Sequence, residues 1–302
     1  MGRRGERPLT LALPPLPPRG QLADFCREAA ARENVQPDLV EKDFYLTRLL
    51  WALGTHFEER LLLKGGTLLS KVDLGFFRMS EDADFVLPVA PSRARGSNVR
   101  QLNQVRDALK TIAPAVGLTT RFPGGQLYEK GSHAVWELDY TSEFGPQAVR
   151  VEASLRPPLR SPRRVLVKQL LAEPLAGDYT GAQCWALDAQ EARAEKVRAA
   201  FTRDAIRDFY DLERLAGIGA DLASPPFIAL VDMKLGELGA PPLNAHRAVF
   251  GLTAARMKTL RRQMDVGLAA VLRSNAPRFD LERMLATFAE IWGLPDPFPS
   301  PD

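Results

Sequence analysis

The stretch Leu61-Leu62-Leu63-Lys64-Gly65-Gly66-Thr67, followed by Ser80-Glu81-Asp82-Ala83-Asp84, decides the fold of this chain. The leucine run predicts a short buried strand, and the two glycines after it permit a tight turn and a close approach of the backbone. A short helix is expected from Thr67, and a second strand is expected over 82–89. The stretch therefore predicts a strand, a turn, a helix and a second strand in succession.

The acidic pair Asp82 and Asp84 suits the binding of a divalent cation. Side chains two residues apart on a strand project to the same face of its sheet, so the two carboxylates can reach one ion. Magnesium is the expected ion, because a few carboxylates commonly hold it together with phosphate oxygens and water. The sequence therefore predicts a Mg²⁺ site on the second strand.

The turn Gly65-Gly66 and the residue Thr67 suit the binding of phosphate. Backbone N–H groups of the turn, the threonine hydroxyl and the start of the following helix all favour a negatively charged ligand. A glycine pair alone is most often only a turn, and an Asp-x-Asp pair alone is most often a solvated surface feature. The succession of both motifs across one predicted unit favours a site for a nucleoside triphosphate.

A third carboxylate is expected from one of two later strands. The strand predicted over 149–155 alternates between apolar and polar residues, and Glu152 on its polar face is the preferred third metal ligand. Glu137 and Asp139 form a rival pair on the strand predicted over 135–140. The sequence leaves the choice between these carboxylates open.

Further helices and strands surround this unit. Helices are predicted over 21–32, 36–53 and 99–116, and a further strand is predicted over 165–171. A mixed sheet with flanking helices, which is an α+β fold, is the economical assembly of these elements.

The C-terminal part of the chain is predicted to be mainly helical. Strand signals are scarce after Gln190, and helices are expected over 190–202, 207–217, 226–238, 256–273 and 281–292. We therefore expect a flexible or extended lead-in, a core that contains the sheet and a helical C-terminal domain, with bounds at 1–19, 20–180 and 181–302.

A second set of charged residues lies in the first two of these C-terminal helices. Lys196 and Arg203 are seven positions apart and share a helix face, from which both can bind a triphosphate. Asp208 and Asp211 follow on the next helix, where either can orient a cation or cap the helix, and Asp211 is the preferred candidate. Basic helices are usually only solvated, but the upstream motifs strengthen the functional interpretation.

In their order along the chain, these motifs resemble the AbiEii/AbiGii nucleotidyltransferase toxins, a family that includes the MenT group. The resemblance covers about 40–212, and only helical character is shared beyond it. It rests on Gly65-Gly66-Thr67 with the acidic pair, on Glu195-Lys196-x-x-Ala199, on Arg207-Asp208-x-x-Asp211-Leu212 and on the upstream segment Val40-Glu41-Lys42-Asp43-Phe44-Tyr45.

This resemblance implies a polymerase-beta-like nucleotidyltransferase core that acts as the toxin of a bacterial toxin–antitoxin system, with a cognate antitoxin as its partner. Several such toxins resemble enzymes that add nucleotides to the acceptor end of tRNA and block translation, so tRNA or another RNA is the expected acceptor. Alternatives are a protein-modifying nucleotidyltransferase and a non-catalytic nucleotide-binding regulator. The resemblance assigns phosphate contacts to Gly66 and Thr67, the metal to Asp82 and Asp84, the triphosphate to Lys196, and a catalytic or supporting role to Asp211.

Composition narrows the remaining possibilities. The 302 residues are 45% hydrophobic and carry a formal net charge of +3, which is typical of a globular protein and too small to establish nucleic-acid binding by itself. The basic run 156–164 and a second cationic set are candidate RNA contacts, although such runs are most often only solvated. The second set is Arg256, Lys258, Arg261 and Arg262.

The two cysteines and the apolar segments point to the expected compartment. Cys26 and Cys184 are expected to be buried thiols, because two distant cysteines form neither a disulfide framework nor a four-cysteine zinc site. No apolar segment approaches the roughly 20 residues that span a bilayer. The chain is therefore expected in the cytoplasm, without insertion into a membrane.

Overall fold

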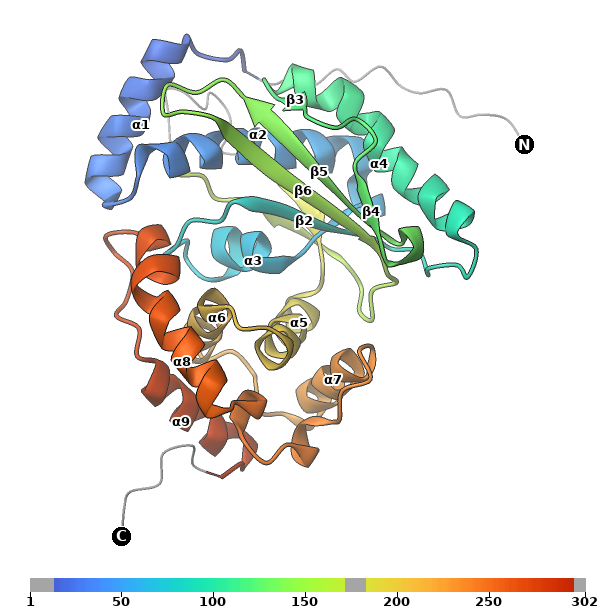
Figure 1. Ribbon diagram of the computed structural model, residues 1–302, viewed down its shortest axis with the longest axis vertical. Helices are drawn as coiled ribbons and strands as arrows, with labels where there is room; N and C mark the ends of the chain where they lie inside the picture. The colour runs from blue at the N-terminus through green and yellow to red at the C-terminus, as the bar shows by residue number, and fades with distance from the viewer. Residues whose placement is uncertain (1–13, 172–182, 296–302) are drawn as a thin grey trace.

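The predicted unit lies in the middle of a mixed sheet, as seen in the computed structural model, which describes residues 14–171 and 183–295 (Figure 1). Strand β1 (Leu62–Leu63) leads into helix α3 (Gly65–Leu68), and the chain returns as β2 (Asp82–Leu87), antiparallel to β1. The sheet order is β3-β5-β6-β2-β1-β8-β7, and β4 pairs with β5 beside β3. The other strands are β3 (Thr119–Thr120), β4 (Gln126–Tyr128), β5 (His133–Tyr140), β6 (Gln147–Leu155), β7 (Arg163–Leu166) and β8 (Gln183–Ala186).

Two pairs of strands in this sheet are parallel, and the others are antiparallel. Strand β2 runs parallel to β6, and β1 runs parallel to β8. The predicted mixed sheet is therefore confirmed. The strand predicted over 165–171 is shorter than expected, since β7 ends at Leu166.

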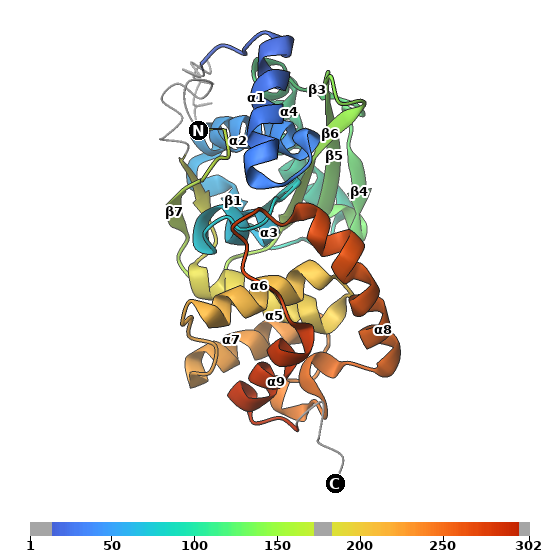
Figure 2. The same ribbon diagram turned by 90° about the vertical axis from the view of Figure 1, so that its left-hand side faces the viewer.

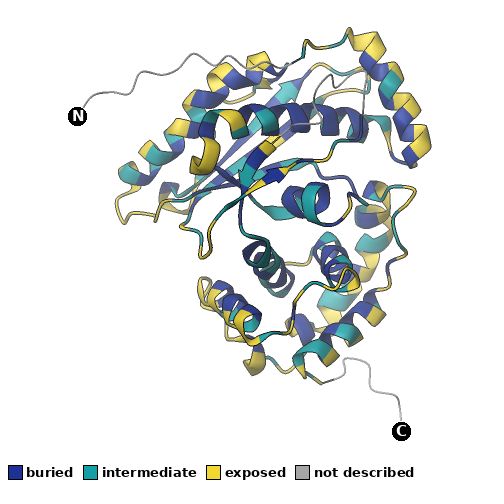
Figure 3. Cartoon of the chain, turned by 180° about the vertical axis from the view of Figure 1, so that it is seen from behind, coloured by how far each residue is buried: buried dark blue, intermediate teal, exposed yellow. Residues whose placement is uncertain are grey.

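One face of the sheet is apolar and is covered by helices α2 (Pro37–Phe57) and α4 (Arg95–Ala115). Alternate residues such as Phe85 of β2 and Val151 of β6 are buried there, as the period of a half-buried strand requires. Helix α1 (Arg19–Glu33) packs on α2, and the view from behind shows the helices crossing this face with their inner sides buried (Figure 3). The polar residues of β2 and β6 therefore lie on the opposite face.

The C-terminal part packs as a separate layer of helices beneath the sheet (Figure 2). Its helices share an aromatic core in which Phe250 contacts Phe201, Phe209 and Phe288. The predicted helical character of this part is confirmed. The helices are α5 (Ala189–Thr202), α6 (Ile206–Gly217), α7 (Pro225–Gly236), α8 (Ala254–Gln263) and α9 (Leu281–Trp292).

The single helix predicted over 256–273 is interrupted in the structure. Helix α8 ends at Gln263, a π-helical turn follows over Met264–Leu268, and a 3₁₀ turn follows over Ala269–Val271. Arg207 of α6 donates from Nε to the carbonyl of Gly267 at 3.0 Å. Because this carbonyl is bound by a side chain from another helix, the regular α-helical pattern does not continue through it.

The predicted domain bounds fall largely on residues that are not described. Residues 1–13 of the lead-in lie outside the described residues, and so does the boundary at 180, within 172–182. Strand β8 follows that boundary in the sequence, yet it lies in the sheet between β1 and β7. The chain therefore adds one more strand to the sheet before its helical part begins.

Two further expectations concern the cysteines and the membrane. Cys26 and Cys184 are buried, as predicted, and burial raises the pKa of each thiol to about 12. Among the residues that the structure describes, no helix has the length and apolar character needed to cross a bilayer.

Candidate active site

Three predicted acidic residues share one patch of the polar sheet face. In the parallel pairing of β2 with β6, Asp84 lies directly opposite Glu152, and Asp82 lies opposite Arg150. Register partners on neighbouring strands point to the same side of a sheet and lie roughly 5 Å apart. The fold therefore brings a carboxylate from β6 beside the acidic pair of β2.

The Glu152 carboxylate is held by two neighbouring side chains. Its Oε2 atom is 3.1 Å from Nε2 of His133 on β5, and its Oε1 atom is 2.8 Å from an Arg150 guanidinium nitrogen. The hydrogen bond to His133 is the main reason that the pKa of Glu152 is lowered. Within residues 14–171 and 183–295, no group of three acidic, histidine or cysteine side chains is gathered closely enough to hold a metal ion.

The rival pair Glu137 and Asp139 lies farther from the acidic pair. Both residues belong to β5, which is separated from β2 by β6, and Glu137 lies opposite Arg150. Arg121 forms ion pairs with both carboxylates, and the three side chains are about two-fifths exposed. The register therefore makes Glu152 the neighbour of Asp84, whereas Glu137 and Asp139 pair with an arginine at the surface.

The acidic pair lies in a crowd of negative charge. The pKa of Asp82 is raised to about 6, first by burial and then by the neighbouring carboxylates of Asp84 and Glu81. Burial and like charge both favour the protonated acid, so the site resists the ionisation of all its carboxylates. A bound cation would relieve this repulsion.

The two glycines are required by close contacts with charged groups. Gly65 has a φ of +72°, and a Cβ atom there would collide with the Asp84 carboxylate. A Cβ atom on Gly66 would lie 2.9 Å from a guanidinium nitrogen of Arg78. Because glycine tolerates positive φ and has no side chain, the first turn of α3 packs directly against the acidic pair. The N–H groups of a first helical turn lack partners within the helix and attract anions.

Thr67 ties α3 to the start of β2. Its side chain is buried, its hydroxyl donates to the backbone carbonyl of Asp82, and its Oγ1 atom is 2.7 Å from Oγ of Ser80. The hydroxyl thus fixes the acidic strand against the glycine turn. Its contact with a phosphate stays a prediction.

Lys196, Asp208 and Asp211 form a buried network with two arginines. Lys196 Nζ is 2.8 Å from a carboxylate oxygen of each aspartate, and its side chain is only 4% exposed. Asp211 also accepts two hydrogen bonds of 2.7 Å from Arg78, and Asp208 accepts two from Arg203. Burial disfavours the ionised aspartates, but the facing cations outweigh it and lower the pKa of both.

Arg78 was missed by the sequence analysis, although it joins the glycine turn to the helical part. Arg78 is buried and lies against Gly66. It donates to Asp211, which is 133 residues later in the chain. Its signal is weak: a single arginine within the apolar segment Leu74-Gly75-Phe76-Phe77-Arg78-Met79. A lone charge in such a segment indicates a buried ion pair, but it does not identify the partner.

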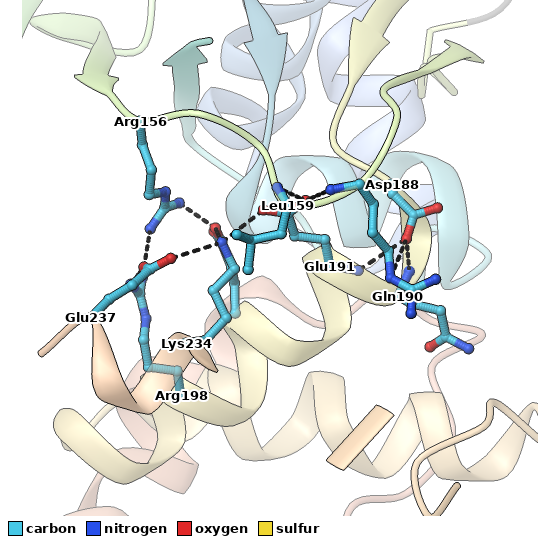
Figure 4. A network of polar contacts seen from close by, with 10 residues as sticks. Arg156, Leu159, Asp188, Gln190, Glu191, Arg198, Lys234 and Glu237 are labelled. Carbon is cyan, nitrogen blue, oxygen red and sulfur yellow. Dashed lines mark hydrogen bonds and ion pairs between the residues drawn. The ribbon is translucent and has the colours of Figure 1, made fainter. Parts of the chain in front are cut away.

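Most of the predicted RNA-binding run 156–164 is bound to the rest of the protein. Arg156 pairs with Glu195 and with Glu237, the latter at 3.2 Å, while the Leu159 and Arg160 backbone N–H groups donate to Glu191 (Figure 4). Lys234 joins this network through Glu191 at 2.7 Å, with both side chains fully buried. The run therefore anchors the sheet to α5 and α7.

The second predicted RNA-binding set is also partly engaged. Arg256 pairs with Asp204 and donates to four backbone carbonyls, and Arg261 pairs with Glu282 at 2.8 Å. Lys258 and Arg262 are exposed. The phosphate contacts predicted for this set stay predictions.

The mixed sheet, the glycine turn against the acidic strand and the helical C-terminal part together have the form of a nucleotidyltransferase. The model of the family "Nucleotidyl transferase AbiEii toxin, Type IV TA system" matches residues 48–288, and the chain belongs to this family. The protein is thus a nucleotidyltransferase toxin of a type IV toxin–antitoxin system. Membership implies a nucleoside triphosphate substrate and an antitoxin partner, and enzymes of this kind generally use a divalent metal.

Two solved structures are similar to this chain. MenT4, a nucleotidyltransferase toxin of Mycobacterium tuberculosis H37Rv, is 21% identical, with 89% of this chain and 94% of that chain covered at a TM-score of 0.53. JHP933 of Helicobacter pylori is 16% identical, with 78% of this chain and 95% of that chain covered at a TM-score of 0.42. No curated protein sequence matches the chain significantly. The likeness to MenT4 supports the predicted fold.

Proposed function

We propose that the protein is a magnesium-dependent enzyme of the cytoplasm that transfers a nucleoside monophosphate from a nucleoside triphosphate to RNA. The proposed acceptor is the 3′ end of tRNA, whose modification would block aminoacylation and therefore translation. The observation that carries the proposal is the register of β2 with β6, which sets Glu152 beside Asp84, the residue against which Gly65 packs.

The acidic pair fits a magnesium ion by its chemistry. Asp82 and Asp84 would supply hard oxygen ligands, and the pKa of Asp82 is raised first by burial and then by neighbouring carboxylates whose repulsion a cation would relieve. Glu152 is the proposed third carboxylate because it neighbours Asp84, and His133 would orient it. When bound, the metal would neutralise charge on the phosphates and so favour displacement at phosphorus.

The triphosphate would lie between the glycine turn and the helical part. The N–H groups of Gly65 and Gly66 begin α3, and Arg203 presents a side chain that is 60% exposed. Lys196 and Asp211 would support this site from behind, since Asp211 holds the Arg78 guanidinium against Gly66. Because Lys196 is buried, it is proposed to position other residues of the site rather than to contact the nucleotide from solvent.

The transfer itself requires one displacement at the α-phosphorus. A hydroxyl oxygen of the acceptor attacks that phosphorus, the bond to the β-phosphate oxygen breaks, and pyrophosphate leaves. The acceptor hydroxyl loses its proton, which the Glu152 carboxylate is placed to accept if it acts as a general base rather than as a metal ligand. Positioning and electrostatics thus supply most of the proposed catalysis.

Incubation of the purified protein with α-labelled nucleoside triphosphates, Mg²⁺ and total tRNA tests this proposal. Label is expected in RNA of tRNA length, and sequencing of the 3′ ends would locate the added nucleotide. Label in protein alone would support the protein-modifying alternative. Nucleotide binding without transfer to any RNA or protein would support the regulator.

A further inference from the structure

Half of the polar sheet face is left open beside the acidic pair. Among the described elements, no helix lies in front of β4, β5 and β6 in Figure 1, whereas α2 and α4 lie behind them. On this open half, Tyr128 of β4 lies opposite His133 of β5, and His133 contacts Glu152. A line of side chains therefore runs from the acidic pair to the edge of the sheet.

Tyr128 and His133 form an aromatic pair at the surface. Their ring centroids are 5.6 Å apart, and the ring planes are inclined by 39°. Tyr128 is 46% exposed, and its hydroxyl donates to Gln126 Oε1 at 2.6 Å, which restrains the ring. An exposed, restrained aromatic ring has the form of a stacking platform for a planar group, such as a nucleic-acid base.

Exposed cations gather at the end of the sheet next to this pair. The short turn after β4 packs on the start of α4, because Asn98 binds the carbonyl of Lys130 at 3.4 Å and a Cβ atom on Gly131 would lie 3.3 Å from the Arg95 side chain. No ion pair joins any of these cations to another described residue, and Glu129 is the acid in this segment. The cations that these contacts place there are Arg95 and Lys130, and the exposed Arg93 and Arg100 flank Arg95 in the sequence.

We propose that this surface binds the acceptor strand, with Tyr128 and His133 stacking on a base near the reactive 3′ end. The exposed cations named above would then contact phosphates farther along the strand. This inference rests on the proposed RNA acceptor and specifies where that acceptor lies. Tyr128 is three strands from Asp84, or about 14 Å at the usual strand spacing, which leaves room for the terminal nucleotide between them.

The charge and shape of the surface favour RNA over a protein partner. Cations without acidic partners complement a phosphate backbone, and a restrained ring accepts any base through its π-face. The surface therefore predicts binding that depends on salt and only weakly on sequence. The run 156–164, by contrast, has several of its polar groups bound internally.

The test is the affinity of the full-length protein for a fluorescent single-stranded oligoribonucleotide, measured by polarisation at several salt concentrations. Tyr128→Ala is expected to weaken binding about tenfold or more, and Tyr128→Phe is expected to bind like the unaltered protein, because the ring is retained. Arg95→Ala should lower the slope of log affinity against log salt by about one. Arg247→Ala, an exposed arginine of the helical part, should leave both quantities unchanged.

Transfer kinetics separate this inference from the proposed function. Tyr128→Ala is expected to raise KM for RNA while leaving KM for the nucleoside triphosphate and the melting temperature unchanged. If the unaltered enzyme labels RNA and Tyr128→Ala does so with the same KM, the stacking platform is wrong and the proposed function stands. If the unaltered enzyme labels no RNA, the proposed function fails.

Two further outcomes would overturn the platform itself. If the unaltered protein does not bind the oligonucleotide, the proposed binding surface is wrong. A Tyr128→Ala protein that binds RNA normally but loses affinity for the antitoxin would assign this surface to the partner protein instead.

Discussion

The aspartates on the open sheet face and those between the sheet and the helical part have opposite electrostatic settings. Burial and the neighbouring carboxylates of Asp84 and Glu81 raise the pKa of Asp82 to about 6. Asp211 faces Arg78 and Lys196, and its pKa is lowered although the residue is fully buried. The nearby carboxylates outweigh Arg150 at Asp82, whereas Arg78 and Lys196 outweigh burial at Asp211. The difference is consistent with the proposed metal site at Asp82 and Asp84 and with the proposed positioning role of the buried network.

The largest expected effect follows from removing one charge on the open face. Asp84→Asn should slow nucleotidyl transfer roughly a thousandfold, or about 4 kcal/mol in barrier height, because it would remove a proposed metal ligand beside the reacting phosphate. The folded protein should keep its melting temperature, since the change also removes a like charge from Asp82. Asp139→Asn, on the same sheet face but paired with Arg121, is the matched control, and loss of activity there would favour the rival carboxylates.

Substitutions in the buried network, unlike Asp84→Asn, should lower the free energy of unfolding. Asp211→Asn leaves Arg78 and Lys196 without their shared anion in the interior, which should cost about 3–5 kcal/mol of unfolding free energy in urea titrations. Glu137→Gln breaks a surface pair with Arg121 and should cost less than about 1 kcal/mol. Equal losses for the two variants would contradict the division between the regions.

Gly65→Ala should disturb the acidic pair through the backbone, without changing any charge. The added Cβ atom would collide with the Asp84 carboxylate, and alanine is strained at this positive φ. The free energy of unfolding should fall by about 1–2 kcal/mol. The rate of nucleotidyl transfer should fall by more than this loss of stability can explain. Gly219→Ala is a matched control, since Gly219 has a φ of +70° and open space where a Cβ atom would lie. It should lose similar stability and keep its activity.

The smallest effect is a change in the pH dependence of stability. The folded pKa of Asp208 is lowered, so its ion pairs stabilise the protein above the unfolded value near 4, and this contribution is lost as the pH falls below it. Asp208→Asn should therefore show a shallower loss of unfolding free energy between about pH 4 and pH 2. Denaturant titrations across that range measure the slope, and an unchanged slope would mean that Asp208 carries no such linkage.

Local sequence patterns predicted those features of the site that lie within a single short segment of the chain. The alternation of β2 placed Asp82 and Asp84 on one face, and the glycine pair marked the sharp change of direction where α3 begins. Period and turn chemistry are local properties, so short stretches of sequence reveal them. The short strands β3, β4 and β8 were not predicted, because two to four residues give too little alternation to detect.

The parts that depend on distant pairing could not be predicted in the same way. The choice of Glu152 over Glu137 as the neighbour of Asp84 follows from strand order and register, which no single segment encodes. The same is true of Arg78, whose partner Asp211 lies on a helix of the C-terminal part. Tertiary packing determines both, and the sequence indicated only that charged residues were present.

The decisive measurement is the magnesium dependence of label transfer from a nucleoside triphosphate to RNA. Transfer by the unaltered enzyme is expected to rise and saturate with Mg²⁺, to stop with a chelator, and to be roughly a thousandfold slower at every Mg²⁺ concentration in folded Asp84→Asn. Transfer that persists in the chelator, or in Asp84→Asn at the rate of the unaltered enzyme, would contradict this expectation.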